Sequence, residues 1–399
     1  MSRRRRWLGG GIAFVTLAGC QERLTQPGEC PALCPGGTPE VIEEILDAIP
    51  QFDSTFTGYA ERGSAQVLLV SGGTPAPADT NIAVVVFQPR PAEIQFAGAA
   101  RTYVVDSIRL GVGLIARDTA VKNLRFEVYR LPPTLDTTAL TYDGVRAELS
   151  VASFLTNIAV PDSALRGPQS VMLRAAEIAP LVLGPADGGR LRIAISVVGD
   201  SPTGTRIGQR NSVVPTSFES FVTPDAPTTQ PTEIEVVPEF DTYVSRVAPV
   251  PTPDLLTVGG VPSSRSLIRF ALPRRLRDSA SVVRATLELV PSEPIRGLPN
   301  DAGTLEVRTL TSDLGAKSPV SPLVLSSRVL PANATTTVEV EIGQLVRLWQ
   351  GPNGLPSTLE LQMSPEAGTF TEAVFGSSRS GTTPRIRFEY LRAFPFERP

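Results

Sequence analysis

The amino-acid sequence predicts an all-β protein built from two tandem antiparallel β-sandwich domains of the jelly-roll type. Apolar and polar residues alternate along many short runs, which is the pattern of strands with one buried face; clear examples are residues 108–114, 124–131 and 191–198. Loops rich in Pro, Gly, Asp and Thr separate these runs. There is little sign of the helices of about 10–15 residues that a parallel sheet needs between its strands.

Length and composition agree with this class. The 399 residues include 38 prolines and 33 glycines, yet valine, leucine and isoleucine occur throughout, as in a turn-rich β protein rather than a disordered chain. One hydrophobic core seldom serves a chain of this length. We therefore expect two domains of roughly 150–180 residues each.

Residues 1–19 have the layout of an export signal peptide. Four arginines at positions 3–6 precede an apolar run over residues 7–18, which is too short to span a bilayer as a folded helix. The small residues directly before Cys20 resemble a bacterial lipobox, and this resemblance implies that the chain is cut before Cys20 after its thiol is diacylated. An ordinary secreted protein with a cysteine near its cleavage point is the alternative.

We interpret residues 20–37 as a linker between the lipid anchor and the folded part, because they include few residues that pack and many that break regular structure. Cys30 and Cys34 are the only cysteines besides Cys20, and in an oxidising envelope we expect them to form a disulfide. In the enterobacterial sorting pattern, an aspartate at the position of Gln21 would retain a lipoprotein at the inner membrane. That resemblance therefore implies the outer membrane.

Charge and histidine content exclude several functions. Without residues 1–19 the chain has 33 basic and 40 acidic side chains, a formal net charge of −7, whereas a nucleic-acid-binding protein needs the opposite sign. Histidine is absent from the whole sequence, which excludes Ser-His-Asp and Cys-His catalysis and zinc sites that use imidazole. With Cys20 acylated, the two remaining cysteines cannot form a thiolate cage. No metal and no cofactor are expected.

Residues 38–50 are predicted to form one short amphipathic helix. Thr38 followed by Pro39 is typical of an N-cap and a first helical turn, and Pro50 ends the run. Apolar residues recur between them at helical spacing, at Val41, Ile42, Ile45, Leu46 and Ile49. Such a stripe would dock on the first domain or, alternatively, contact a partner.

A segment rich in proline and threonine, residues 223–232, lacks apolar periodicity and is predicted to be the linker between the domains. It separates a first sandwich domain at residues 51–222 from a second at residues 233–392. The second domain contains further alternating runs, up to a last strand at residues 385–391.

The two halves of the chain align as an internal repeat. Residues 170–185 match residues 337–352 at a constant offset of 167, with apolar residues coinciding at four positions and a Gly-Pro pair at the same place in both. After one inserted residue, the run LRIAI of the first half meets LELQM of the second. We therefore expect two domains of one fold.

Five segments of the second half occur in the order of a known family, at residues 240–245, 256–273, 285–290, 338–362 and 375–390. Together they resemble the DNRLRE-type, carbohydrate-binding-like β-sandwich modules of bacterial surface proteins. This resemblance implies a jelly-roll sandwich and, in some members, polysaccharide binding. The motif that names the family is not present as written, and the first half joins the family only through the internal repeat.

Two aromatic residues are candidates for a platform on which a sugar ring would stack. Trp349 is the only tryptophan that remains once residues 1–19 are removed; packing in the core beside Leu345 is the alternative for this residue. Tyr243 is the second candidate, although a tyrosine within a strand is more often half-buried than directed at a ligand.

Acidic residues give two further hypotheses. Glu339 and Glu341 lie two positions apart on one strand and could serve as paired glycosidase carboxylates at roughly 5–10 Å, but the solvated face of an amphipathic strand has the same pattern. The acids of loops 299–303 and 312–315 could hold calcium, yet they lack the spacing of an EF-hand loop and are typical of turns. We find no nucleophile elbow, Walker loop or dinucleotide fingerprint.

These observations predict a lipid-anchored protein of the cell envelope, at the outer membrane, that acts as a non-catalytic binding or scaffold module with polysaccharide as its ligand. The alternative is a structural or assembly lipoprotein that binds other envelope proteins. A glycoside hydrolase with a carboxylate-based site is the third hypothesis. The expected partners are thus the membrane and either polysaccharide or envelope proteins, but not nucleic acid.

Overall fold

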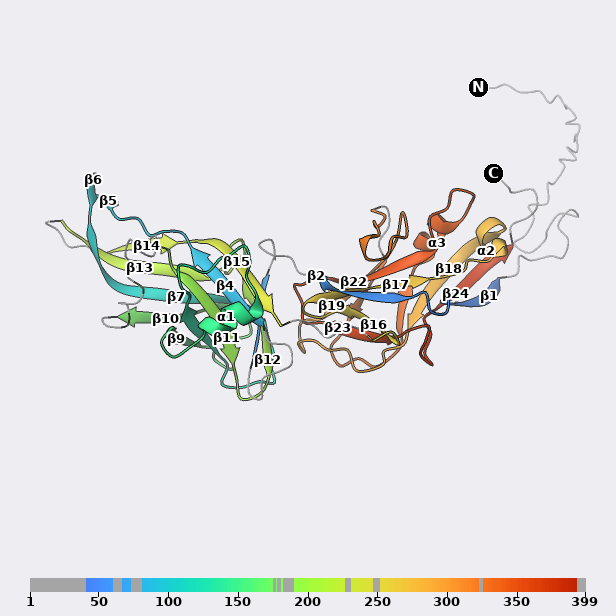
Figure 1. Cartoon of the computed structure of the whole chain (residues 1–399), viewed down its shortest axis with the longest axis horizontal. Helices are drawn as coiled ribbons and strands as arrows, with labels where there is room; N and C mark the ends of the chain where they lie inside the picture. Colours follow the sequence, from blue (N-terminus) through green and yellow to red (C-terminus); the bar gives the residue numbers. More distant parts are fainter. Residues whose placement is uncertain are drawn as a thin grey trace, which may run out of the picture. The chain divides into compact units, whose positions relative to one another are not determined.

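The chain folds into antiparallel strands with a few short helices. The computed structural model describes residues 41–59, 67–72, 81–174, 177, 181, 190–226, 231–246, 252–322 and 326–392. The helical elements in this part of the chain are α1 (Tyr142–Glu148), α2 (Arg274–Asp278), α3 (Gly343–Trp349) and the 3₁₀ helix η3 (Gly315–Lys317). All the other regular elements there are strands (Figure 1). The predicted all-β class is confirmed.

Strand pairing divides the sheets into two groups, which we call lobe 1 and lobe 2, and each has its own hydrophobic core. Lobe 1 contains β3 (Val67–Gly72), β4 (Asn81–Phe87), β5 (Ile94–Phe96), β6 (Ala99–Arg101), β7 (Tyr103–Arg117), β8 (Arg125–Arg130), β9 (Phe154–Ala159), β10 (Gly167–Arg174), β11 (Arg192–Val198), β12 (Thr203–Gly208), β13 (Ser217–Pro224), β14 (Thr232–Val236) and β15 (Pro238–Ser245). Lobe 2 contains β1 (Ile42–Asp47), β2 (Ser54–Tyr59), β16 (Leu255–Gly259), β17 (Ser263–Arg269), β18 (Ala280–Leu289), β19 (Gly303–Thr309), β20 (Ser326–Leu330), β21 (Val338–Glu341), β22 (Thr358–Ser364), β23 (Glu372–Gly376) and β24 (Arg385–Arg392).

Lobe 2 is a sandwich of two antiparallel sheets. A four-stranded sheet has the order β1-β24-β18-β21, and a larger sheet has the order β20-β19-β22-β17-β16-β23, with β2 paired to β17. Alternate residues of each strand point inward, so that side chains from both sheets fill one core. Leu287 and Phe388 from the first sheet and Leu361 and Phe375 from the second are all fully buried there.

Lobe 1 follows the same plan, although its strands join into one continuous ladder. β14, β13, β7 and β10 pair in that order, and β12 connects them to the remaining strands by pairing with both β7 and β3. Buried apolar residues of β4, β7 and β11, such as Val85, Leu110 and Ile193, form the core. The two sides of this sandwich therefore share backbone hydrogen bonds as well as a core.

The two lobes have the same pairing order, which supports the predicted internal repeat. β7 lies between β10 and β13 in lobe 1, as β18 lies between β21 and β24 in lobe 2. Likewise, β11 lies between β4 and β8, as β22 lies between β17 and β19. The aligned runs LRIAI and LELQM fall on β11 and β22. Their inward residues are buried in both lobes: Leu191, Ile193 and Ile195, and Leu359, Leu361 and Met363.

The lobes are nested rather than strictly tandem. β1 and β2 precede lobe 1 in the chain, yet β1 pairs with β24 and β2 pairs with β17, both in lobe 2. The equivalent places in lobe 1 are taken by β14 on β13 and β15 on β4, which follow the other strands of that lobe. Lobe 1 is therefore inserted between β2 and β16 of lobe 2.

The predicted domain boundaries need correction for this reason. Residues 223–232 do not link the lobes, because β13 ends at Pro224, β14 begins at Thr232, and these two strands pair with each other. The predicted first domain, residues 51–222, omits two strands of lobe 1 and includes β2 of lobe 2. The predicted second domain, residues 233–392, contains β15 of lobe 1. Proline and threonine favour a connection between hairpin strands as much as a linker between domains.

The helix predicted for residues 38–50 is also wrong where the structure describes it. The strand β1 forms there, at one end of the four-stranded sheet. Ile42 and Leu46 pack against the core of lobe 2, whereas Ile45 is 53% exposed. Residues 38–40 lie outside the described part of the chain.

Candidate functional site

The outer face of the larger sheet of lobe 2 carries a pocket of about 430 Å³, which we call the polar pocket. Alternation along β22 directs Leu361 and Met363 into the core and Glu360 and Gln362 to the opposite face. Neighbouring strands β17 and β19 contribute arginines and a glutamate to the same face. The polar residues that line the pocket are Arg265, Glu306, Arg308, Gln362, Ser364 and Glu366.

Arg265 forms one wall of the polar pocket. Its guanidinium donates two hydrogen bonds to the carboxylate of Glu366, at 2.7 and 2.5 Å. It also lies over the ring of Tyr59, 4.2 Å from the ring centroid, and 3.6 Å from the carboxylate of Glu360. The hydrogen bonds to Glu366 raise the pKa of Arg265 against the opposing effect of burial. Because its contacts are made within the protein, Arg265 shapes the pocket before any ligand arrives.

Glu360 lies beside Arg265 and is only 5% exposed. Burial raises the pKa of its carboxyl group; the charge of Arg265 opposes this shift, the charge of Glu366 adds to it, and the charge of Arg308 opposes it. Oε1 of Glu360 has no hydrogen-bond partner, since Arg265 is too distant for a hydrogen bond. An unsatisfied buried polar atom costs about 1–3 kcal/mol, so a ligand that donates to this oxygen would recover part of that cost.

Arg308 leaves a second polar atom unsatisfied. Its Nη2 donates to Glu306 at 2.6 Å, but its buried Nε has no partner. Arg308 and Glu360 stand directly opposite each other on β19 and β22, so a donor and an acceptor that both lack a hydrogen bond lie on neighbouring strands. A hydroxyl group both donates and accepts hydrogen bonds. The pocket therefore suits a ligand that is rich in hydroxyl groups.

The corresponding place in lobe 1 is closed. By the shared pairing order, the opposed residues Gln362 and Glu306 of lobe 2 correspond to Ala194 and Tyr129 of lobe 1. There, Val145 of α1 joins Ala194 in a small second core on the outer face of the sheet, and Tyr129 packs against it. The repeat thus presents an apolar, covered surface in lobe 1 and a polar, open surface in lobe 2. The outer face of lobe 2 is therefore open to solvent or a ligand where that of lobe 1 is covered.

The polar pocket was not predicted from the sequence. On a single strand, alternating charged residues such as Glu306 and Arg308 indicate only a solvated face. A signal was nevertheless present in the repeat, because the alignment of LRIAI with LELQM places Gln362 on Ala194. A polar residue in one copy and an apolar residue in the other is the mark of a surface whose use has diverged.

Trp349 lies at the end of α3 in the core of lobe 2. It is 2% exposed, its ring stacks against Phe270 with the centroids 6.4 Å apart, and its indole N–H donates to Oγ1 of Thr309 at 2.6 Å. The ring and its N–H group are both engaged within the protein. The hypothesis of a sugar platform at Trp349 is therefore wrong, and the core-packing alternative is correct.

Tyr243, on β15, is also buried, with 6% of its surface exposed in the core of lobe 1. Its hydroxyl donates to the backbone carbonyl of Ala367, which belongs to lobe 2. A ring in this position packs between the lobes and cannot stack on a sugar. The second platform candidate is therefore excluded as well.

Glu339 and Glu341 lie on the exposed face of β21, as expected for the solvated side of an amphipathic strand. Glu341 pairs with Arg284 at 3.0 Å, and Glu339 pairs with Arg387 at 3.5 Å. Both carboxylates take part in surface ion pairs of the four-stranded sheet. They lie on the other sheet from the polar pocket.

The acids of the two loops considered for calcium are used in ion pairs. Asp301 pairs with Arg206, and Asp313 accepts two hydrogen bonds from Arg269, one of them at 2.7 Å. The hydrogen bonds from Arg269 hold the pKa of Asp313 below its usual value. Within the described residues, no three Cys, Asp or Glu side chains converge as metal ligands.

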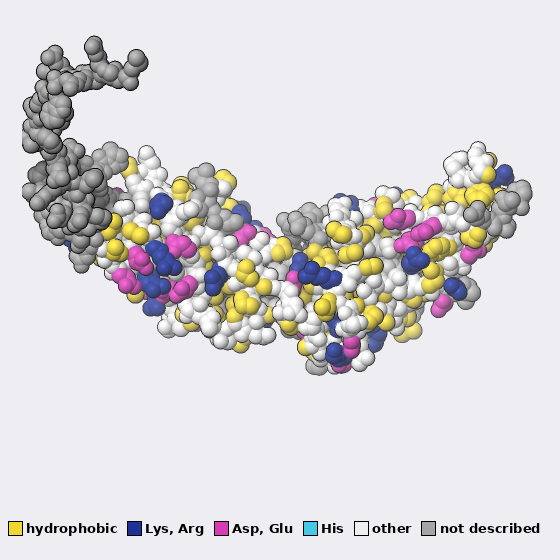
Figure 2. Space-filling model, turned by 180° about the vertical axis from the view of Figure 1, so that it is seen from behind, with side chains coloured by type: hydrophobic (Ala, Val, Ile, Leu, Met, Phe, Trp, Pro, Cys, Tyr) yellow, Lys and Arg dark blue, Asp and Glu magenta, His cyan; other side chains and the backbone are white. Residues whose placement is uncertain are grey.

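The predicted anchor lies outside the described residues. Cys20, Cys30 and Cys34 all belong to residues 1–40, so the lipid and the disulfide stay predictions. No helix in the described part of the chain has the length and apolar character needed to cross a membrane. On the face shown in Figure 2, basic and acidic side chains are interspersed, without the continuous basic surface that nucleic acid attracts.

Comparison with known proteins adds no relative to this picture. No protein-family model matches the chain, and the search of curated proteins found no similar sequence. The resemblance of the second half to DNRLRE-type modules therefore stays a prediction.

Proposed function

We propose that this protein is a lipoprotein of the cell envelope, anchored at the outer membrane through Cys20, and that lobe 2 binds polysaccharide without catalysis. The polar pocket is the observation that carries the proposal. Its lining residue Arg308 has a buried Nε without a hydrogen bond. Glu360, directly opposite Arg308 on the same sheet face and just outside the lining, has a carboxylate oxygen without one. Sugar hydroxyls satisfy both kinds of group, and the duplicate surface in lobe 1 is closed by α1.

The charges of the pocket favour a neutral polysaccharide over an acidic one. Glu306, Glu360 and Glu366 face Arg265 and Arg308; Arg265 pairs with Glu360 and Glu366, and Arg308 pairs with Glu306. Burial raises the pKa of Glu360, beside the pocket, which further disfavours its charged form. Three glutamates and two arginines leave an excess of only one negative charge. An ionic ligand would therefore gain little electrostatic attraction from the site.

Observations on lobe 2 bear on two alternative functions, a glycoside hydrolase and an assembly lipoprotein. A glycoside hydrolase would need two carboxylates that are free to act, but Glu366 is held by two hydrogen bonds from Arg265. An assembly lipoprotein is favoured by β1, a strand at the end of its sheet with Ile45 exposed, since an edge strand can pair with a strand of a partner.

The binding proposal is tested by isothermal titration of the mature protein with a panel of neutral and acidic polysaccharides. We expect binding of a neutral polysaccharide with a Kd in the range of about 1 μM to 1 mM, and no release of reducing ends. Gln362→Ala and Arg308→Gln should each weaken binding at least about tenfold. Arg284→Gln, on the other sheet, is the matched control and should bind normally. Equal losses in all three variants, or no binding to any polysaccharide, would contradict the proposal.

The anchor is tested separately by fractionation of the host cell. Cys20→Ser should move the protein from the membrane fraction to the soluble fraction and abolish labelling with radioactive palmitate, because the thiol that carries the lipid is gone. Cys30→Ser is the control, which should stay in the membrane fraction. If the Cys20→Ser protein remains membrane-bound, the lipoprotein assignment is wrong.

A further inference from the structure

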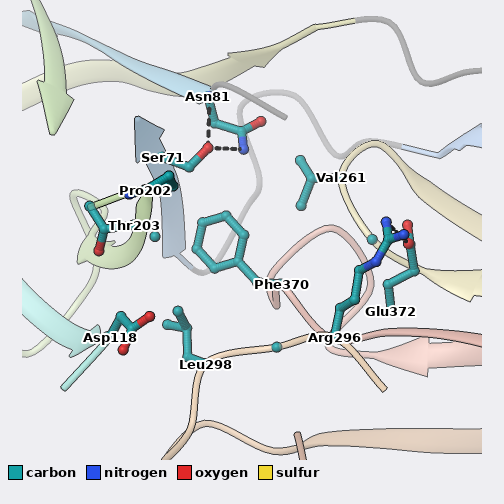
Figure 3. Close-up of a pocket in the computed structure, with 13 residues that line it drawn as sticks. Ser71, Asn81, Asp118, Pro202, Thr203, Val261, Arg296, Leu298, Phe370 and Glu372 are labelled. Atoms are coloured by element: carbon teal, nitrogen blue, oxygen red, sulfur yellow. Dashed lines mark hydrogen bonds and ion pairs between the residues drawn. The ribbon is translucent and has the colours of Figure 1, made fainter. Parts of the chain in front are cut away.

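A second cavity, of about 360 Å³, is lined by residues of both lobes (Figure 3), and we call it the junction cavity. Ser71, Asn81 and Thr203 lie at ends of the strands β3, β4 and β12 of lobe 1. Val261 and Phe370 come from loops of lobe 2. The junction cavity shares no lining residue with the polar pocket. It can therefore take a ligand of a different kind.

Two buried side chains of the junction cavity have polar atoms without a partner. The backbone N–H and the carboxamide nitrogen of Asn81 both donate to Oγ of Ser71, at 3.0 and 2.8 Å. This arrangement turns the carboxamide oxygen away from Ser71 (Figure 3), and that oxygen has no hydrogen-bond partner although Asn81 is 1% exposed. Oγ1 of Thr203, which is 6% exposed, is likewise unpartnered. Both groups can accept a hydrogen bond from a ligand.

Among the charged groups of the lining, Asp118 adds a further acceptor, whereas the terminal nitrogens of Arg296 are held in ion pairs. Asp118 accepts a hydrogen bond from the backbone of Ala120 at 2.9 Å, through one oxygen of its carboxylate. Arg296 is the one basic residue among the described lining residues, and it is paired with Glu372 and with Glu293, both at 2.9 Å. The unpartnered acceptors and the carboxylate of Asp118 therefore favour a ligand that brings donors and a positive charge.

Phe370 supplies an apolar and aromatic surface to the same cavity. Figure 3 shows its ring centrally among the lining side chains. The ring lies against Gly204 of lobe 1, where an added Cβ would come within 3.1 Å of a ring carbon. Glycine at this position thus allows the ring of one lobe to reach the backbone of the other. Aromatic faces attract cations as well as apolar groups.

We propose that the junction cavity binds a small organic ammonium ion. Its N–H groups donate to the carboxamide oxygen of Asn81 and to Oγ1 of Thr203, its charge is balanced by Asp118, and its apolar part packs on Phe370. An anionic ligand would face acceptors and a carboxylate instead. The volume is within the range of small-molecule sites. This proposal does not depend on polysaccharide binding by lobe 2.

The experiment compares three probes of similar shape on the mature full-length protein: cyclohexylammonium, cyclohexanol and cyclohexanecarboxylate. Thermal unfolding and isothermal titration are measured at constant ionic strength. We expect cyclohexylammonium to raise the Tm and to bind at least about tenfold more tightly than cyclohexanol, with no response to the carboxylate. An equal response to all three probes, or no response to the ammonium ion, would overturn the proposal.

Variants place the binding in the cavity. Asp118→Asn keeps the acceptor for Ala120 but removes the charge, and it should abolish the preference for the ammonium ion over cyclohexanol. Thr203→Val keeps the shape of the side chain and removes the unpartnered hydroxyl. It should therefore weaken binding of the ammonium ion without destabilising the free protein. Asp162→Asn, at a surface ion pair with Lys122, and Thr205→Val, two residues along β12, are the matched controls. If the controls lose as much affinity as the cavity variants, the site lies elsewhere.

Discussion

Glu360 and Leu361 are neighbours in sequence and differ in role because a strand points them to opposite faces. Leu361 is fully buried in the core of lobe 2, whereas Glu360 lies on the outer face with an unsatisfied oxygen. Trp349 shows the reverse case, since its ring and N–H group are satisfied inside the protein. Residue type alone therefore does not identify a recognition residue. Hydrogen-bonding capacity left unused in the fold is the better indicator.

The raised pKa of Glu360 predicts a pH-dependent contribution to stability. The folded protein favours the protonated carboxyl, so this contribution is fully present below the ordinary pKa of 4.5 and is lost as the pH rises through the raised value. Glu360→Gln, which imitates the protonated form, should raise the free energy of unfolding at pH 7 and flatten its dependence on pH above about 4.5. Urea denaturation between pH 4 and 8 measures both effects.

Two comparisons make this result specific. Asp241 is also buried with a raised pKa, so a smaller slope of the same sign should persist in the Glu360→Gln protein. Glu366→Gln should instead destabilise at pH 7, because it weakens the hydrogen bonds to Arg265. Destabilisation by Glu360→Gln at pH 7 would mean that the attraction of Arg265 outweighs the cost of burial.

Among the elements, β1 and α1 show how edges and faces of the duplicated fold are completed differently. β1, which precedes lobe 1 in the chain, completes the four-stranded sheet of lobe 2 by pairing with β24. The equivalent place in lobe 1 is taken by β14, which follows the other strands of its sheet and pairs with β13. α1 covers the outer face of lobe 1 with Val145, whereas lobe 2 leaves the polar pocket at that position. The additions to the common sandwich, rather than the sandwich itself, thus distinguish the two lobes.

The strand β1 predicts different effects for two adjacent apolar residues. Leu46→Ala should lower the free energy of unfolding by about 1–2 kcal/mol, because Leu46 packs partly buried against the core. Ile45→Ala should change it by less than about 0.5 kcal/mol, because Ile45 faces solvent. Urea denaturation of both variants gives the comparison. A helix with both residues on its buried stripe would give similar losses, and that outcome would refute the strand.

At the scale of the whole molecule, the nested order of the chain makes lobe 2 depend on both of its segments. β2 pairs with β17 and β1 with β24, although lobe 1 intervenes in the sequence. Tyr243 and Arg206 of lobe 1 also bond to Ala367 and Asp301 of lobe 2. Two covalent crossings and these contacts couple the lobes, so a ligand in the junction cavity would act on both of them.

Fragments test the nested arrangement. A fragment of residues 252–392 should fail to unfold cooperatively, because it lacks β1 and β2 and exposes the edges of β24 and β17. Joining residues 41–59 to it through a flexible linker should restore a cooperative transition in urea. Residues 67–246, which contain every strand of lobe 1, should fold alone and serve as the control. A fragment 252–392 as stable as the linked form would contradict the arrangement.

The extent of prediction differs between the fold and the candidate site. Alternation at residues 108–114 and 191–198 predicted strands that the structure confirms as parts of β7 and β11. It could not tell a helix from a strand at residues 42–47, because both fit a short apolar run. The platform candidates Trp349 and Tyr243 were wrong because burial depends on the strands packed around them.

The sequence by itself determined the all-β class, the positions of strands with clear alternation such as β7 and β11, and the internal repeat, because side-chain alternation is a local property that each strand carries alone. Only the tertiary structure decided which strands belong to which lobe, that β1 is a strand, and where polar atoms stay unsatisfied. Those outcomes depend on pairing between segments far apart in the chain. The polar pocket and the junction cavity form only when such segments meet, so no single stretch of sequence could reveal them.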